Sequence, residues 1–148
     1  MKIYIGSDHN GFELKKQLIT FLVKGNYEVI DCGDSVLDPR DDYPKFAATL
    51  AHQLEVSSDP ESFGILICGS GQGINIAANR FSFIRSALCW NVVEAHSARN
   101  DDDCNVLSLS ARSTSFEEAV KIINSFLSTP FAGAGRFKRR LIELSKLP

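Results

Sequence analysis

The chain has 148 residues, 44% of them apolar and 23% charged, with a formal net charge of −2 at pH 7. This length is enough for one domain with a water-excluding core. The sequence has no apolar stretch of about 20 residues, no recognisable secretory leader and no basic tract, which argues against a membrane protein, an exported protein or a nucleic-acid-binding protein. We expect one domain over residues 1–148, located in the cytoplasm, with neither a membrane nor a nucleic acid as partner.

The four cysteines are widely spaced, at positions 32, 68, 89 and 104. They form no C-x-x-C pair and show none of the close spacings of a zinc site. We expect reduced thiols, as is usual in the cytosol, and no metal site.

Short apolar runs alternate with longer amphipathic stretches, a pattern typical of strand–helix units around a parallel sheet. The pattern predicts a doubly wound α/β fold with five strands, and Trp90 and the many phenylalanines are expected in its core. In chain order we expect a strand at 3–5, a helix at 12–23, a strand at 27–30, a helix at 43–56, a strand at 63–68, a helix at 74–80, a strand at 85–89, a helix at 91–99, a strand at 105–109, a helix at 115–127 and a final basic helix at 135–147.

Open α/β sheets bind their ligands at the carboxyl ends of the strands. The segments expected at that edge are 6–10, 69–73 and 99–104. We therefore look for function in these three segments.

The motif "CGSGQG" at 68–73 places three glycines between a strand and a helix. Backbone N–H groups there can point at an anion without side-chain obstruction, which predicts an oxyanion or phosphate cradle. A sharp turn that needs small residues is the structural alternative. The dinucleotide fingerprint fails because Ile74 stands where its third glycine belongs, and no Gly-Lys-Ser/Thr follows.

Cys68 lies directly before this motif, where a helix N-terminus would favour a thiolate that acts as a base or nucleophile. The alternative is an inert cysteine at the end of a buried strand. Asp8 and His9 form a second polar cluster after the first strand. His9 could equally be an ordinary loop histidine.

Three arginines suggest a site for a phosphate group. Arg136 and Arg140 are four residues apart on one face of the last helix, and Arg112 follows the fifth strand. Such a fork suits a phosphate monoester. Lys138 and Arg139 make the helix basic all round, so the alternative is a solvated basic helix.

Together the segments "GSDHNGFELK", "DYP" at 42–44, "ILICGSGQGINIAANR", "ARNDDDCNVL" and "GRFKRR" resemble the ribose-5-phosphate isomerase B family, which is related to the galactose-6-phosphate isomerase subunits. The resemblance implies a Rossmann-like three-layer α/β/α protomer with a five-stranded, mostly parallel sheet and an extra C-terminal helix. It also implies a homodimer or dimer of dimers with active sites shared between subunits. The implied reaction is aldose–ketose isomerisation of a sugar phosphate through a cis-enediolate, without metal or other cofactor.

The resemblance assigns a role to each matching position. It makes Cys68 the base that moves a proton between C2 and C1, while the backbone of Gly69–Gly73 holds the enediolate oxygens and Ser70 bonds the reacting edge. A tuned thiolate beside fixed donors also suits the abstraction of such a proton. The remaining substrate contacts implied are Asp8, His9, Tyr43, Gly69, Gly71, Gln72, Gly73 and Asp102, with Arg112, Arg136 and Arg140 on the phosphate.

One position departs from the family pattern. Asp101 stands where many members carry the histidine credited with opening the furanose ring. An ionised aspartate is a poor proton donor at neutral pH. Either His9 opens the ring, or Asp101 is kept protonated by Asp102 and Asp103, or the preferred substrate differs; we favour His9. Asp101–Asp103 could also be a solvated acidic turn.

The leading hypothesis is the interconversion of ribose 5-phosphate and ribulose 5-phosphate in the pentose phosphate pathway. A hexose 6-phosphate, such as that of galactose or allose, is the second candidate substrate. A non-catalytic phosphosugar-binding subunit is a third hypothesis, and the retention of Cys68 and Ser70 argues against it. A cysteine hydrolase or glutaminase would need a histidine paired with Cys68, and only His9 is available.

Overall fold

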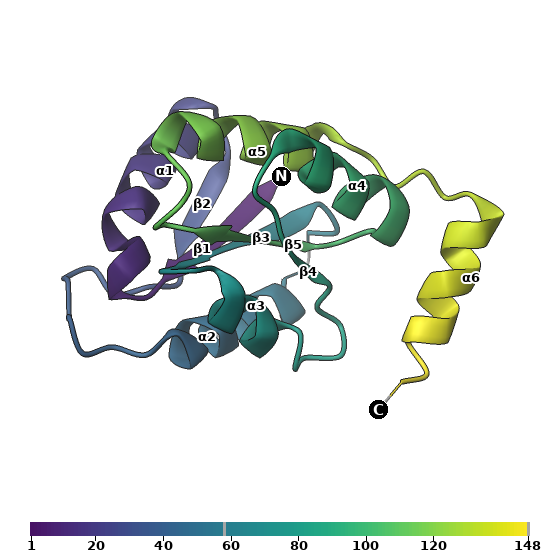
Figure 1. Cartoon of the computed structure of the whole chain (residues 1–148), viewed down its shortest axis with the longest axis horizontal. Coiled ribbons are helices and arrows are strands. Elements are labelled where there is room, and N and C mark those ends of the chain that lie inside the picture. The colour runs from purple at the N-terminus through teal and green to yellow at the C-terminus, as the bar shows by residue number, and fades with distance from the viewer. Residues whose placement is uncertain (58, 148) are drawn as a thin grey trace.

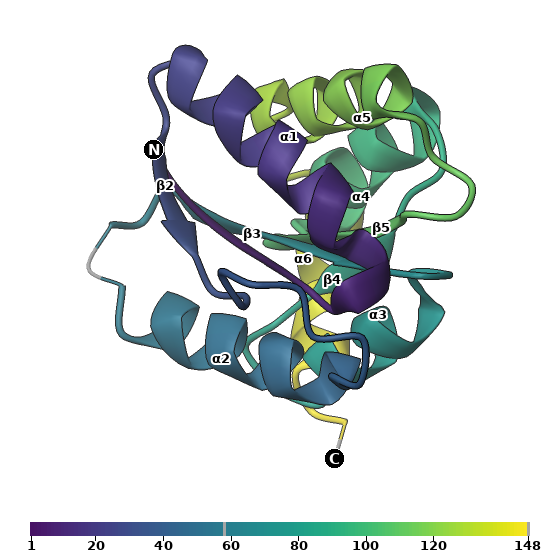
Figure 2. The same ribbon diagram turned by 90° about the vertical axis from the view of Figure 1, so that its left-hand side faces the viewer.

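The computed structural model describes residues 1–57 and 59–147, which form one parallel sheet between two layers of helices (Figures 1 and 2). The sheet order is β2-β1-β3-β5-β4, and every pairing is parallel. The strands are β1 (Lys2–Ser7), β2 (Glu28–Asp31), β3 (Ser62–Cys68), β4 (Ser86–Leu88) and β5 (Val106–Ser110). The helices are α1 (Phe12–Lys24), α2 (Tyr43–Glu55), α3 (Gln72–Ala78), α4 (Val92–Asp102), α5 (Phe116–Ser128) and α6 (Gly135–Leu144), with a 3-10 turn, η1 (His9–Gly11), before α1.

The central strand β3 is buried on both faces, as its continuous apolar sequence predicts. Ile65 and Ile67 face the layer formed by α1, α4 and α5, whereas Leu66 and Cys68 face α2 and α3. β3 pairs with β1 up to Ser7↔Ile67 and with β5 up to Cys68↔Ser110. This register brings the carboxyl ends of the three central strands to one edge of the sheet.

The predicted strands and helices are confirmed, with shifted ends. The fold is the three-layer α/β/α arrangement expected, and the C-terminal helix is present. α5 begins at a capping box in which Ser115 and Glu118 bond each other's backbone N–H groups. α4 begins after its cap Asn91 and continues beyond its predicted end to Asp102, where Asp103 ends it in a left-handed conformation with φ of 47°.

The prediction that segment 99–104 lies at the carboxyl edge is wrong. In a parallel sheet, the helix between two strands must carry the chain back to the start of the next strand. α4 does this, and β5 begins only at Val106. Residues 99–104 therefore lie at the amino edge, opposite Cys68.

The expectation that Trp90 belongs to the core is also wrong. Trp90 is 65% exposed, in the loop between the edge strand β4 and α4, where no layer covers it. Val93 is exposed beside it in sequence, and Ile142 is exposed on α6. α6 stands apart from both helical layers (Figure 1), and Phe137 is its only buried residue. Among the described helices, none has the length and apolar character needed to cross a membrane.

Candidate active site

The turn after β3 is held by the loop that follows β5. Ala111 N–H donates to the carbonyl of Cys68 at 2.9 Å, and Arg112 N–H donates to the carbonyl of Gly69 at 3.0 Å. Gly71 has a φ of +74°, and a Cβ there would lie 2.5 Å from Leu88 Cδ1 and 3.0 Å from the backbone of Leu109. Only glycine fits this turn.

The four cysteines differ in their surroundings. Burial raises the pKa of Cys32 to about 11 and the pKa values of Cys89 and Cys104 to about 12. These three are therefore protonated thiols at neutral pH. Cys68, 4% exposed, ends β3 and is the cysteine that directly precedes the glycine turn.

Tyr43 and Ser70 lie beside the same turn. Tyr43 opens α2, and its ring packs against Gly73 in the first turn of α3. Ser70 is exposed, and its Oγ accepts a hydrogen bond from Gln72 N–H at 3.3 Å. The structure thus brings the predicted residues of the "DYP" and "CGSGQG" motifs together.

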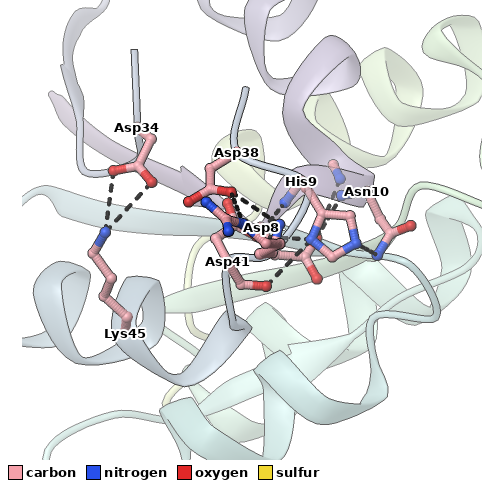
Figure 3. A network of polar contacts seen from close by, with 9 residues as sticks. Asp8, His9, Asn10, Asp34, Asp38, Asp41 and Lys45 are labelled. Carbon is pink, nitrogen blue, oxygen red and sulfur yellow. Dashed lines mark hydrogen bonds and ion pairs between the residues drawn. The ribbon is translucent and has the colours of Figure 1, made fainter. Parts of the chain in front are cut away.

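A second polar cluster lies after β1, at the same edge (Figure 3). Asp8 is buried, and its Oδ1 accepts hydrogen bonds from Asn10 N–H at 3.0 Å and Gly11 N–H at 3.3 Å, which shapes η1. His9 Nδ1 lies 2.8 Å from Asp41 Oδ1, and its Nε2 lies 3.0 Å from Asn10 Nδ2. The hydrogen bond that His9 donates to Asp41 is the main cause that raises the pKa of His9, and the negative charge of Asp8 adds to it.

Arg112 joins this cluster to the turn after β3. A Cβ on Gly69 would lie 3.3 Å from Arg112 Nη2 and 3.4 Å from Asn10 Cγ, so both side chains flank the backbone of Gly69. Within residues 1–57 and 59–147, no acidic side chain forms an ion pair with Arg112. The guanidinium is available to an anion that enters beside Gly69.

Four predicted site residues lie at the opposite end of the fold: Asp101, Asp102, Arg136 and Arg140. Ala132 N–H donates to the carbonyl of Asn100 at 3.1 Å, which places the segment before α6 beside the end of α4. Asp101 accepts a hydrogen bond from Asn100 Nδ2 at 2.7 Å. The Arg136 guanidinium lies 4.3 Å from the centre of the Phe137 ring. Within one copy of the chain these residues do not reach Cys68.

The model of the ribose/galactose isomerase family matches residues 3–144. The chain belongs to this family. Ribose-5-phosphate isomerase B of Mycolicibacterium paratuberculosis is 40% identical over 146 residues, which cover 99% of this chain and 91% of that protein. A probable ribose-5-phosphate isomerase B of Mycoplasma pneumoniae is 46% identical over 137 residues, covering 93% of this chain and 89% of that protein.

Solved structures of ribose-5-phosphate isomerase B share the fold. The Clostridium thermocellum structure gives a TM-score of 0.93 at 39% identity, covering 99% of this chain and 96% of that chain. The Mycoplasma genitalium structure, which has bound ribulose-5-phosphate, gives 0.92 at 39% identity and covers 98% of this chain and 94% of that chain. The α/β/α fold expected from the resemblance is confirmed.

In this member of the ribose/galactose isomerase family, sequence analysis overlooked Asp41 and Asn10. Both contact His9, and neither residue is among the predicted site residues. Asp41 is 32 positions from His9, so no spacing rule connects the two. The local signal is Asp41 itself, which directly precedes the "DYP" motif.

Two cavities of this family member lie away from Cys68. One of about 450 Å³, lined by residues that include Arg85, Arg99 and Asp103, and another of about 310 Å³ both lie at the amino edge. The described residues include no group of three His, Cys, Asp or Glu side chains placed to hold a metal ion. The cluster around Cys68 lies at the carboxyl edge, where Cys68 itself is buried and Ser70 is exposed.

Proposed function

We propose that this protein interconverts ribose 5-phosphate and ribulose 5-phosphate, with Cys68 as the base, in the cytoplasmic pentose phosphate pathway. The observation that carries the proposal is the position of Cys68: it ends the central strand, directly before the glycine turn that Arg112 flanks. Full-length relatives named ribose-5-phosphate isomerase B, one of them with bound ribulose-5-phosphate, support this substrate.

The proposed reaction moves one proton between two carbons. The Cys68 thiolate takes the proton from C2 of the open-chain aldose, and the electrons of that bond form the C1–C2 double bond of an enediolate. The negative charge passes to O1, where the backbone N–H groups of the turn stabilise it. Cys68 then returns the proton to C1, while O2 loses its proton to O1 and becomes the ketose carbonyl.

The furanose ring must open before this step. We assign ring opening to His9, because it lies at the same edge as Cys68 and hydrogen bonding to Asp41 favours its protonated form. Asp101, which occupies the position where the resemblance expects a histidine, lies at the end of the fold that also carries Arg136 and Arg140. The choice between Asp101 and His9 therefore rests on which side chain can donate a proton. An imidazolium is a proton donor near neutral pH, whereas an ionised carboxylate is not.

A second copy of the chain completes the proposed site. Arg136 and Arg140 project from α6, which stands apart from its own subunit (Figure 1), and Trp90 and Ile142 leave apolar surface exposed. Exposed apolar surface of this kind is typical of an interface between proteins. In a two-fold dimer each α6 would reach the partner's site, so two equivalent sites form.

The test is a turnover assay of the purified protein with pentose 5-phosphates and hexose 6-phosphates, with no metal added. We expect reversible interconversion of ribose 5-phosphate and ribulose 5-phosphate. In water labelled with oxygen-18, the sugar phosphates should take up label only at the carbonyl oxygen, which exchanges with water by itself. If galactose 6-phosphate or allose 6-phosphate is turned over faster than ribose 5-phosphate, the hexose phosphate is the preferred substrate. Binding of all these sugars without turnover would instead indicate a non-catalytic phosphosugar-binding subunit.

A further inference from the structure

Asp41 holds His9 through two hydrogen bonds to one carboxylate oxygen. His9 N–H donates to Asp41 Oδ1 at 2.8 Å, and the imidazole Nδ1 lies 2.8 Å from the same atom (Figure 3). The Asp41 side chain is only 7% exposed, whereas the His9 side chain is 32% exposed. A buried carboxylate therefore fixes one edge of a ring whose other edge remains accessible.

The loop that carries Asp41 is fastened by two lysines. Lys15, 1% exposed on α1, donates to both carboxylate oxygens of Asp31 at 2.7 and 2.8 Å and to the carbonyl of Asp34 at 3.0 Å. Lys45 on α2 donates to Asp34 Oδ1 at 3.2 Å. Anchored at these points, the loop can hold Asp41 at a fixed distance from His9.

The opposite edge of the imidazole points toward the glycine turn through Asn10. His9 Nε2 lies 3.0 Å from Asn10 Nδ2, and Asn10 Cγ lies beside the backbone of Gly69. The amide of Asn10 can turn over, so it can donate to a neutral imidazole or accept from an imidazolium. A proton on Nε2 thus faces the side where a sugar phosphate would enter.

The charges around His9 favour its cationic form. Asp41 faces it from the loop, and Asp8 faces it from the preceding position of its own turn. Arg112, beside the backbone of Gly69, is a cation at the same edge, and Arg40, next to Asp41 in the loop, pairs with Asp38. The charges of Asp41 and Asp8 both raise the pKa of His9.

We propose that Asp41 is a positioning residue for His9: it fixes the imidazole with Nε2 toward the glycine turn and supplies the carboxylate that faces the imidazolium. This inference rests on the proposed isomerase function. In ring opening, Nε2–H gives its proton to the ring oxygen as the bond from C1 to that oxygen breaks. The anomeric hydroxyl loses its proton to water as the C1 carbonyl forms, so the number of protons is conserved. The pair supplies the proton donor that an ionised carboxylate at position 101 does not provide.

The test compares Asp41→Asn with the matched control Asp38→Asn, which removes the same charge from the same loop without touching His9. Asp38 Oδ1 accepts from Arg40 N–H instead. We expect the midpoint of the His9 titration, followed by NMR of the imidazole, to fall toward about 6.5 in Asp41→Asn only. The rate from ribose 5-phosphate should fall about tenfold at pH 7.5 in this variant, and its decline with rising pH should begin at a lower pH.

The inference is overturned if His9 titrates alike in wild type, Asp41→Asn and Asp38→Asn, or if both variants lose the same rate. The wild-type titration is a test that needs no variant: a midpoint at or below that of a free imidazole contradicts the inference even where Asp41→Asn does not fold. These NMR readouts do not depend on turnover. If the protein has no isomerase activity, the proposed function is refuted. The NMR titration of His9 would still test whether Asp41 raises the pKa of His9.

Discussion

The ring of Tyr43 lies against the backbone of Gly73, so closely that a Cβ on residue 73 would stand 2.6 Å from Tyr43 Cζ and 3.0 Å from its Oη. This contact joins the start of α2 to the start of α3 at the edge where Cys68 lies. Gly73→Ala should push the half-exposed ring aside, since a side chain can move where backbone cannot.

We expect Gly73→Ala to raise the KM for ribose 5-phosphate by roughly fivefold, which corresponds to about 1 kcal/mol, with little loss of stability. A double-mutant cycle with Tyr43→Ala checks the cause. If displacement of the ring is responsible, Gly73→Ala should add little in the Tyr43→Ala background. Fully additive effects would show that the two residues act independently.

Gly71 should be the least replaceable glycine of the turn. Gly71→Ala adds a Cβ at a φ of +74°, against the side chain of Leu88 and the backbone of Leu109. We expect urea unfolding to show a loss of about 2–3 kcal/mol in the free energy of unfolding. Gly6→Ala is the control, because its Cβ would meet only ordinary contacts at 3.5–3.7 Å and should change stability by less than about 1 kcal/mol. Equal losses of unfolding free energy in both variants would show that the positive φ and close contacts at Gly71 do not make it harder to replace than Gly6.

His9→Ala should separate ring opening from proton transfer. Without an acid at the ring, the enzyme can use only aldose that opens spontaneously. The rate from ribose 5-phosphate should then stop rising as more enzyme is added, because the uncatalysed opening limits it. The initial rate from the acyclic ribulose 5-phosphate should remain proportional to enzyme. A forward rate that stays proportional to enzyme at all concentrations would exclude His9 as the ring-opening group.

Mixing two variants that are both impaired at substrate concentrations below the wild-type KM tests whether Arg136 and Arg140 act across subunits. Alone, each Arg→Ala change should raise KM, through a loss of about 1.5–3 kcal/mol of charge-assisted hydrogen bonding.

Cys68→Ala chains should be unfolded and refolded together with chains that carry both Arg136→Ala and Arg140→Ala. A two-fold dimer of one chain of each kind has one intact site, so an equal mixture should regain about one quarter of wild-type activity. A mixture that regains none would place the arginines in the same subunit as their cysteine, or outside the site.

The order of the strands and helices could be predicted from the sequence, because each has its own apolar period and most are bounded by glycine, proline or capping residues. The site around Cys68 was also predictable, since its "CGSGQG" motif is contiguous. The Asp41–His9 contact was not, because it joins distant positions through a loop that has no period of its own.

The errors arose where one residue's surroundings depend on the path of the whole chain. Residues 99–104 were expected beside Cys68, yet α4 returns the chain to the amino edge. Trp90 was expected in the core on the strength of its residue type, yet the edge position of β4 leaves it uncovered. Neither fact follows from local composition.

The role of Cys68 as the base is tested most directly by proton exchange in heavy water. Wild-type protein, Cys68→Ala and the control Cys89→Ala should be incubated with ribose 5-phosphate and, separately, with ribulose 5-phosphate in D2O. NMR of the sugar then reports isomerisation and deuterium incorporation together. Cys89 is buried with its pKa raised to about 12, so it is a protonated thiol and a suitable control. We expect Cys89→Ala to behave as wild type. Cys68→Ala should bind the sugar phosphate with an affinity within about tenfold of wild type. Its rates of isomerisation and of exchange of carbon-bound protons should both lie below about 1% of the wild-type rates. Isomerisation or exchange by Cys68→Ala at more than about 5% of the wild-type rate would contradict the assignment of Cys68 as the base.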